Sequence, residues 1–264
     1  MMAEVKPFRA LYYNEVKAPL GRVTAPPYDV ISPEEREELY RKSEFNVVRV
    51  DFGKDEPSDD RRTNRYTRAR LYLDRWIQEG VLLEDESPSF YLYEQSFMDP
   101  VTSQAKTRKA LFVLLKLEEI GRGVVFAHEK TNPKPKEDRL RLLNETEANL
   151  SPVFGLYEDA NSTVARILDS FRASNPFLET RPGFEARDRL WKITGELADS
   201  LARAFSAKSI LLADGHHRYE TAILHRDLKR APGEDPCTYV MIALGAMQDP
   251  GLLVLPTHRL IRSF

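Results

Sequence analysis

The sequence predicts a mixed α/β fold in which a mixed sheet carries flanking helices. Strand and helix patterns alternate irregularly along the chain, which favours a mixed sheet over a purely parallel one. Two apolar runs in the middle of the chain, residues 89–97 and 110–117, follow each other as the strands of a hairpin would. A third apolar run, residues 209–214, stops at Gly215, and a helical pattern begins at once.

The N-terminal elements are predicted from their capping and spacing patterns. Prolines force an extended path in "APPYDVISPEE", and Ser32 with Glu35 forms a capping box that starts a helix to about residue 42. Residues 46–52 are rich in β-branched side chains, which is typical of a strand. Ser58 is expected to cap a long helix whose apolar residues recur at helical spacing up to Gly80. Strands are then expected over 89–97, 110–117 and 123–128.

The C-terminal elements alternate between helices and short apolar strands. A polar, proline-bearing loop leads into a helix over about 136–148, and "VFGLY" predicts a strand over 153–157. The remaining predicted elements are helices over 162–173 and 188–205, a strand over 209–214, a helix to about residue 230, and strands over 238–247 and 252–256.

The chain length of 264 residues is sufficient for one α/β domain with a substantial core. We expect a single domain over 1–264, with a tentative division into an N-terminal part, 1–100, and a part that carries the glycine turn, 101–264. The last residues, "PTHRLIRSF", end without a capping or polar tail. We therefore expect this chain to be a fragment of a longer protein.

Composition excludes several classes of protein. Lys and Arg total 39 and Asp and Glu 41, and this balance argues against a dedicated nucleic-acid binder. Neither a membrane span nor the apolar core of a signal peptide is visible, so we expect a cytoplasmic protein with no membrane partner. The single cysteine, Cys237, excludes an internal disulfide and a multi-cysteine zinc site.

The most informative segment is "LLADGHHRYETAIL", residues 211–224. Gly215 permits a sharp turn, and a helix that starts at His216 or His217 would present backbone N–H groups and a positive dipole end to an anion. A phosphate fits there, and Arg218 adds donors that can bind its oxygens in bidentate fashion. Successive helical residues point about 100° apart, so one histidine is expected to face the ligand while the other packs.

Asp214 allows more than one interpretation. It could cap the helix, coordinate Mg²⁺ carried by a nucleotide, or act as a base on a substrate hydroxyl. A carboxylate beside a bound phosphate would repel it unless a metal ion lies between them, so metal coordination resolves the conflict most simply. Capping uses only one oxygen, and these roles are compatible.

Further polar side chains stand at predicted strand ends or turns and are candidates for catalysis or substrate binding. Each also has the simpler interpretation of a solvated turn or loop residue. The candidates are Asp29 and Glu129 for catalysis, and His128, Thr131, Arg139, His258 and Arg259 for substrate binding. A P-loop, a G-x-S-x-G elbow and a His-Glu-x-x-His zinc motif do not occur in the sequence.

The segment "ADGHHRYETA" resembles the signature of the ParB/sulfiredoxin superfamily, and its Asp-Gly-His-His-Arg run resembles the free serine kinase branch. The segments "VKPFRALYYN", "APPYDVIS", "HEKTNPKPKEDRLRLL", "ANLSPVFGLY" and "LPTHRL" extend the similarity to a large bacterial and archaeal family of unknown function, often encoded near serine biosynthesis genes. The resemblance implies a strand-turn-helix core that binds nucleotide phosphates through Gly215, His217 and Arg218. Thr221 stands where the superfamily often has alanine, and the catalytic glutamate of serine kinases has no motif here.

These observations lead to one main functional hypothesis and two rivals. The main one is a nucleotide-dependent phosphotransferase that uses ATP or ADP with Mg²⁺ and acts on a small hydroxyl substrate such as free L-serine. The cofactor site would comprise Gly215, His216, His217 and Arg218, with Asp214 as metal ligand. The first rival is a nucleotide-binding regulatory module without turnover, for which nucleotide-dependent stabilisation or formation of a homodimer is expected. The second is a nucleic-acid binder, which the balanced charge disfavours.

Overall fold

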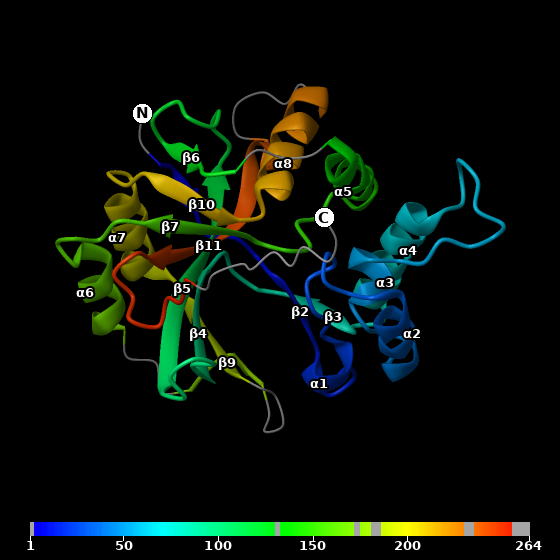
Figure 1. Cartoon of the computed structure of the whole chain (residues 1–264), viewed down its shortest axis with the longest axis horizontal. Coiled ribbons are helices and arrows are strands. Elements are labelled where there is room, and N and C mark those ends of the chain that lie inside the picture. Colours follow the sequence, from blue (N-terminus) through cyan, green and yellow to red (C-terminus); the bar gives the residue numbers. More distant parts are fainter. Residues whose placement is uncertain (1–2, 130–132, 172–174, 181–185, 230–234, 255–264) are drawn as a thin grey trace, which may run out of the picture.

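A computed structural model describes residues 3–129, 133–171, 175–180, 186–229 and 235–254. Within these ranges the chain has a mixed α/β fold, with a nine-stranded mixed sheet flanked by eight α-helices (Figure 1). The predicted fold class is confirmed. Within the same ranges, none of the helices combines the length and apolar character that crossing a bilayer requires.

The large sheet has the order β6-β10-β7-β11-β5-β4-β9-β8, and β1 also pairs with β5. β10 runs parallel to β6, and β11 runs parallel to β7, whereas the other pairs are antiparallel. Its strands are β1 (Val5–Lys6), β4 (Phe90–Met98), β5 (Ala105–Lys116), β6 (Val125–Ala127), β7 (Val153–Tyr157), β8 (Leu178–Glu179), β9 (Arg187–Ile193), β10 (Ile210–Asp214) and β11 (Tyr239–Ala246). A separate pair joins β2 (Leu11–Tyr13) to β3 (Leu82–Glu84).

Helices cover both faces of the large sheet (Figure 1). α6 and α7 lie on one side, while α8, α5 and the N-terminal helices lie on the other. The helices are α1 (Leu20–Val23), α2 (Pro33–Lys42), α3 (Val48–Asp51), α4 (Arg65–Gln78), α5 (Pro133–Thr146), α6 (Thr163–Ser170), α7 (Gly195–Phe205) and α8 (His216–Lys229), with a 3-10 turn at Pro236–Thr238.

The alternation of side chains along each strand gives the sheet two distinct faces. On one face Leu111 pairs with Leu244, and Tyr157 packs edge-on against Phe205 of α7 at 4.9 Å between ring centroids. On the other face Ala243 lies between Phe112 and Phe154 and is not covered by α6 or α7. The first face therefore holds the main core, and the second faces α8 and the N-terminal helices.

A smaller apolar core holds the N-terminal helices together and connects them to α5. Trp76 of α4 is only 1% exposed and contacts the rings of Tyr72, Phe45 and Tyr13. Leu142 of α5 joins the same cluster. Residue 100, the tentative division of the chain, lies in the turn between β4 and β5, which are neighbouring strands of one sheet.

The chain after β11 returns along the edge of β5. β11 pairs with β5 only from Leu111 to Lys116, and beyond that point the amide of Lys109 donates to Oδ2 of Asp249 at 2.8 Å. A Cβ atom at position 251 would lie 2.1 Å from the Thr107 carbonyl oxygen. Only glycine permits so close an approach of the two backbones.

Two predicted elements are wrong in type. Residues 46–52, predicted as a strand, contain helix α3, because the side chain of Asn46 accepts from the Val48 amide in a local turn that leads into the helix. Residues 188–205, predicted as one helix, divide into β9 and α7. The first part, β9, pairs with β4, with Trp191 opposite Leu92, so sheet pairing overrides the helical pattern.

Two other predictions need adjustment. Helix α4 starts at Arg65 with Asn64 as its cap, rather than at Ser58, because the intervening residues form turns. The predicted strand over 252–256 is not a strand at 252–254, and its last two residues lie outside the described ranges. The predicted strands over 89–97, 123–128, 153–157, 209–214 and 238–247, and the helices near 32–42, 136–148, 162–173 and 216–230, are confirmed with small shifts in their ends, as far as the structure describes them; residues 172–173 and 230 lie outside the described ranges. The strand predicted over 110–117 is also confirmed, but it begins earlier, at Ala105.

Candidate functional site

The glycine turn after β10 has the predicted strand-to-helix geometry. β10 ends at Asp214, Gly215 has φ +86°, and α8 begins at His216. This φ lies in the left-handed region that L side chains rarely adopt. A Cβ atom at position 215 would also lie 3.1 Å from the Arg218 guanidinium. Glycine therefore permits both the turn and the return of Arg218 over it.

Arg218 is held at this turn by two acceptors. Its Nη2 donates to Oδ2 of Asp214 at 2.6 Å, and its Nη1 donates to the Pro152 carbonyl, at the start of β7. The Arg218 side chain is 20% exposed, whereas that of Asp214 is 70% exposed. The guanidinium is thus fixed beside the start of α8, and Asp214 can still reach solvent or a ligand.

A cleft of about 570 Å³ opens beside Asp214 and Arg218. Its floor is the face of the sheet opposite α6 and α7, with Phe112, Phe154 and Ala243. Its other walls bring together distant parts of the chain, including Pro26, Pro27, Asp51, Arg108, Ser151 and Leu252. Asp214 pairs in register with Phe154 after an irregularity in β10, which places it at this cleft.

Asp51 is a carboxylate of the cleft that the sequence did not single out. Nη1 of Arg139 donates to its Oδ1 at 3.0 Å, and the Ser151 hydroxyl donates to its Oδ2 at 3.2 Å. Its side chain is 13% exposed. The sequence pattern assigns residues 46–52 to a strand, and for that reason it does not indicate Asp51 as a site residue. An acidic side chain inside an apolar run is nevertheless a sequence pattern that could have indicated a functional carboxylate.

Arg139, a predicted substrate-binding residue, has a structural set of partners instead. It is 8% exposed, pairs with Asp51 and with Asp138 at 2.6 Å, and lies 3.9 Å above the Tyr28 ring. Asp138 also accepts from Arg65 and Tyr66 of α4. This cluster of Asp51, Asp138, Arg139, Arg65 and Tyr66, called here the arginine cluster, supports the cleft wall formed by α3.

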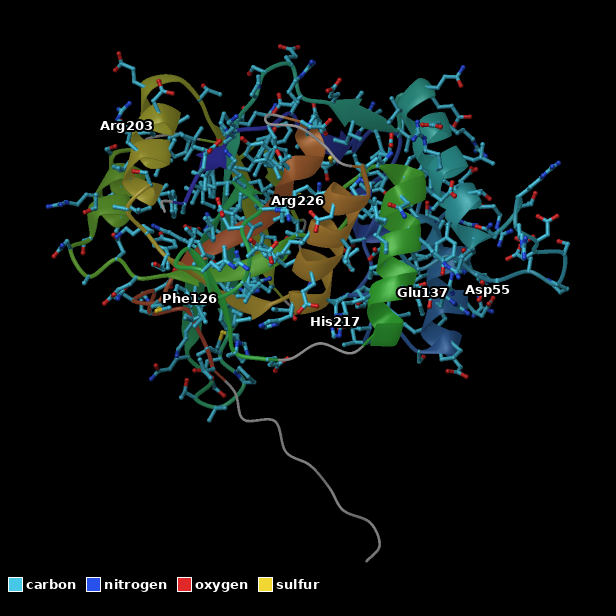
Figure 2. The ribbon with its side chains drawn as sticks, turned by 90° about the horizontal axis from the view of Figure 1, so that it is seen from above. Asp55, Phe126, Glu137, Arg203, His217 and Arg226 are labelled. Carbon is cyan, nitrogen blue, oxygen red and sulfur yellow. The ribbon has the colours of Figure 1, made fainter. Side chains whose placement is uncertain are left out.

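The two adjacent histidines of α8 point in different directions, as helical geometry requires. His216 is 5% exposed, and its ring packs edge-on against His128 at 4.8 Å between centroids. The Nε2 atom of His216 has no hydrogen-bond partner within the described residues. Burial lowers the pKa of His216, and the neighbouring His128 lowers it further. His217 lies half-buried at the first turn of α8 (Figure 2).

His128 and Glu129 lie at the end of β6, beside the glycine turn, because β6 and β10 are parallel neighbours. Nδ1 of His128 lies 3.0 Å from the Leu212 carbonyl oxygen, which can only accept, so this nitrogen carries the proton. The Glu129 carboxylate is exposed and lies 3.6 Å from Nε2 of His128. Both residues therefore share the sheet edge with Asp214 and Arg218.

Asp29 and His216, two further predicted residues, do not line the cleft. Asp29 is exposed in the turn at residues 28–30, next to the cleft residues Pro26 and Pro27 but not among the residues that line it. Thr131, His258 and Arg259 lie outside the described residues. The side chain of His216, expected to bind a cofactor, packs against His128.

The described residues contain no group of three or more His, Cys, Asp or Glu side chains arranged to hold a metal ion. A Mg²⁺ ion needs only one or two carboxylate ligands from the protein when phosphate oxygens and water complete its octahedral shell. Asp214 and Asp51, which line one cleft, fit that requirement as carboxylate donors.

A family model described as "Protein of unknown function (DUF1015)" matches residues 5–264. No curated protein and no solved structure matches the chain.

Proposed function

The chain belongs to the DUF1015 family of proteins of unknown function, and from that premise we propose that it is a nucleotide-dependent phosphotransferase. It transfers a phosphoryl group from ATP or ADP, with Mg²⁺, to the hydroxyl of a small substrate, and free L-serine is the proposed acceptor. The supporting observation is that the start of α8, Gly215 and Arg218 all lie at one end of the 570 Å³ cleft.

The phosphates are proposed to bind at the first turn of α8. The first backbone N–H groups of a helix have no carbonyl acceptor within the helix, so they can donate to a ligand. The positive end of the helix dipole also favours an anion at this place. Gly215 lets a phosphate approach the backbone closely, and the fork of Arg218 supplies charged donors. The resemblance of "ADGHHRYETA" to the ParB/sulfiredoxin superfamily supports the same placement.

The acceptor hydroxyl is proposed to lose its proton to a carboxylate of the cleft. Of the three candidate carboxylates of the sequence, Asp29, Glu129 and Asp214, the one that lines the cleft is Asp214. Asp51 is added as a second candidate because it lines the same cleft. In the reaction the oxygen–phosphorus bond to the nucleotide breaks, a bond to the substrate oxygen forms, and the carboxylate takes the proton.

A metal ion, when bound, would neutralise charge on the transferred phosphoryl group. The chain's own contribution is to position the reactants. Arg218 would bind phosphate oxygens, Asp214 and Asp51 would orient the metal or the hydroxyl, and the apolar floor around Phe112 and Phe154 would exclude water.

A regulatory nucleotide-binding module is the second candidate. The specific observation in its favour is that Arg218 is already paired with Asp214 and with the Pro152 carbonyl. A nucleotide that took over the guanidinium would release Asp214 and β7, which is a binding-driven change that does not require turnover.

The test is Arg218→Ala, with Arg226→Ala as its matched control. Arg226 lies on the same helix and is 21% exposed, but it pairs with Glu119 and Asp227, away from the cleft. We expect Arg218→Ala to reduce phosphoserine formation, followed by mass spectrometry, by roughly 10²–10³-fold. Arg226→Ala should retain the wild-type rate.

A thermal-shift series with ATP, ADP and other nucleotides distinguishes the two candidates. Stabilisation by a nucleotide that Arg218→Ala abolishes, with no phosphorylated product from any small alcohol, would assign the regulatory module. Equal turnover by wild type and Arg218→Ala would overturn the assignment of the phosphate site.

A further inference from the structure

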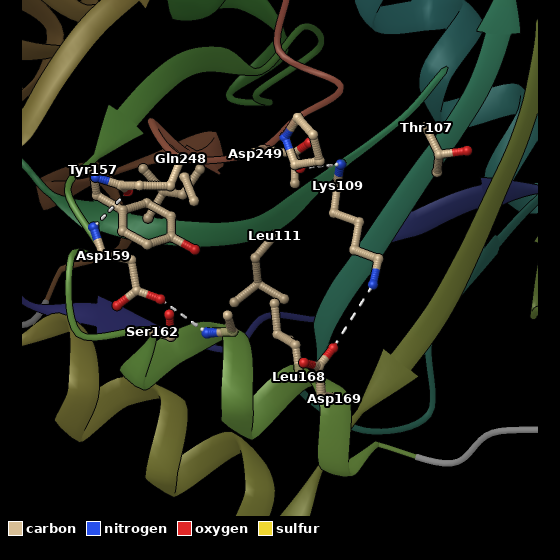
Figure 3. A pocket seen from close by; sticks show the side chains of 15 residues that line it. Thr107, Lys109, Leu111, Tyr157, Asp159, Ser162, Leu168, Asp169, Gln248 and Asp249 are labelled. Carbon is tan, nitrogen blue, oxygen red and sulfur yellow. Dashed lines mark hydrogen bonds and ion pairs between the residues drawn. The ribbon is translucent and has the colours of Figure 1, made fainter. Parts of the chain in front are cut away.

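A second cavity, of about 330 Å³, lies on the sheet face opposite the cleft (Figure 3). Leu111 and Leu244 form its floor, and Ala165 and Leu168 of α6 form a wall. The ring of Tyr157 closes one end. Because these leucine, alanine and tyrosine side chains present carbon atoms to the cavity, its interior is mainly apolar. Its volume lies at the lower end of the range of about 300–1,000 Å³ that is typical of small-molecule sites.

The hydroxyl of Tyr157 points into this cavity (Figure 3). The side chain is 3% exposed, and the hydroxyl has no hydrogen-bond partner within the described residues. Burial raises the pKa of this phenol, and the charges of Asp159 and Asp249 raise it further, so it stays protonated near neutral pH. The hydroxyl is reached from the cavity, so a bound ligand can form a hydrogen bond with it.

The charges around the cavity do not balance. Asp159 is paired with Lys208 at 3.0 Å and accepts from backbone amides of α6, and Asp169 is paired with Lys109 at 4.0 Å. Asp249 accepts only from the amides of Lys109 and Gly251, and no cation pairs with it in the described part of the chain. Among the described residues, Asp249 is therefore the acidic group of this cavity that has no paired cation.

We propose that this cavity binds a small organic cation, a protonated primary amine with an apolar body. The ammonium donates to the Tyr157 hydroxyl and is attracted by the carboxylate of Asp249. The apolar body packs against Leu111, Leu168 and Leu244. An anion would meet the carboxylate of Asp249, and a neutral ligand would gain only the hydrogen bond and apolar contact.

The site is independent of the proposed phosphotransferase function. The cavity and the cleft lie on opposite faces of the sheet and share only the edge formed by Lys109, Ala110, Ala246 and Asp249. Loss of nucleotide binding in Arg218→Ala would therefore leave this proposal standing, and loss of amine binding would leave the phosphotransferase proposal standing.

Isothermal titration calorimetry of the full chain at neutral pH tests whether the cavity selects a positively charged ligand. It compares the affinities of three probes that have the same shape and different charges. The probes are 2-phenylethylamine, 2-phenylethanol and phenylacetate. We expect the amine to bind at least about tenfold more tightly than the alcohol, an advantage that weakens with added salt, and phenylacetate to show no binding.

Variants locate the binding. Tyr157→Phe should weaken amine binding roughly fivefold to tenfold, because it removes only the hydroxyl. Leu168→Trp should abolish binding by filling the cavity. Tyr12→Phe, which changes a tyrosine of β2 outside the cavity, should bind like wild type. Melting temperatures of the variants check that each one folds.

Equal affinity for the amine and the alcohol would overturn the proposal, as would preference for phenylacetate or unchanged binding by both Tyr157→Phe and Leu168→Trp. Tighter binding of L-phenylalanine than of 2-phenylethylamine would also overturn it, because the site would then select a zwitterion.

Discussion

His216 places an imidazole ring in the interior of the protein, where its charged form is poorly solvated. The ring contacts His128, and burial lowers the pKa of His216 below its ordinary value of 6.5. The unfolded chain therefore takes up the proton first as the pH falls. The free energy of unfolding should be at its full value above about pH 6.5 and decrease as the pH falls below it.

This pH dependence can be measured by urea unfolding between pH 7.5 and pH 5. His216→Asn should flatten the decrease, although His225, whose pKa burial also lowers, leaves part of it in place. A variant that retained the complete wild-type slope would show that His216 does not titrate with folding.

Single residues also show why part of the site could be predicted. Gly215, His216 and Arg218 lie within four consecutive residues, so local geometry alone indicates a turn, a helix start and an arginine close to it. Asp51 could not be found in that way, because its partner Arg139 is 88 residues distant. Its place in the cleft depends on the bonds between Arg139 of α5 and the end of α3, which no local pattern records.

At the scale of the element, the start of α4 shows how a capping pattern can mislead. Asn64 accepts from the amides of Tyr66 and Thr67, and Thr67 accepts in return from the amide of Asn64. Ser58, the predicted cap, is exposed and lies outside the helix. Both residues have capping propensity, and only the tertiary path of the chain selects between them.

The two positions therefore make a matched test of helix capping. Asn64→Ala should lower the free energy of unfolding by about 1 kcal/mol, because it removes the acceptor for two amides at the helix start. Ser58→Ala should change it by less than about 0.5 kcal/mol. Chemical denaturation measures both, and the reverse order would place the functional helix start at Ser58.

Helices and strands were predicted correctly where the hydrophobic pattern of the sequence agrees with the tertiary packing. They were predicted wrongly where the pattern and the packing favour different structures. β7, β11 and residues 110–115 of β5 are apolar and lie in the core, so their composition is enough to predict them as strands. β9 carries charged and aromatic residues at spacings that also suit a helix, and pairing with β4 decides its type. That pairing joins segments about a hundred residues apart in sequence, and the periodicity of apolar residues is a local pattern that carries no information on such distant contacts.

At the scale of the whole molecule, the arginine cluster connects the N-terminal helices to the rest of the fold. Arg139 of α5 binds Asp51 of α3, and Asp138 binds Arg65 and Tyr66 of α4. Burial alone would raise the pKa of Asp138, but the charge and hydrogen bonds of Arg139 hold that pKa below its usual range. The wall of the cleft around Asp51 depends on this connection.

Removal of Arg139 should therefore affect stability and the cleft together. Arg139→Met leaves Asp51 and Asp138 without their main partner and should lower the free energy of unfolding by about 3–5 kcal/mol. Arg141→Met, two residues further along α5 in a pair that is 60% exposed at the arginine, should cost less than about 1 kcal/mol. Equal effects in urea unfolding would exclude the cluster as the connection.

The close approach of position 251 to β5 has a consequence for how copies of this protein behave toward one another. The backbone of β5 from residue 105 to residue 110 lacks a β11 neighbour and would otherwise offer free amide and carbonyl groups. Such an open strand edge is a template for intermolecular pairing and aggregation. Asp249 and Gly251 occupy that edge with a carboxylate and a closely fitted backbone. The same short segment that separates the two cavities thereby protects the protein's colloidal stability.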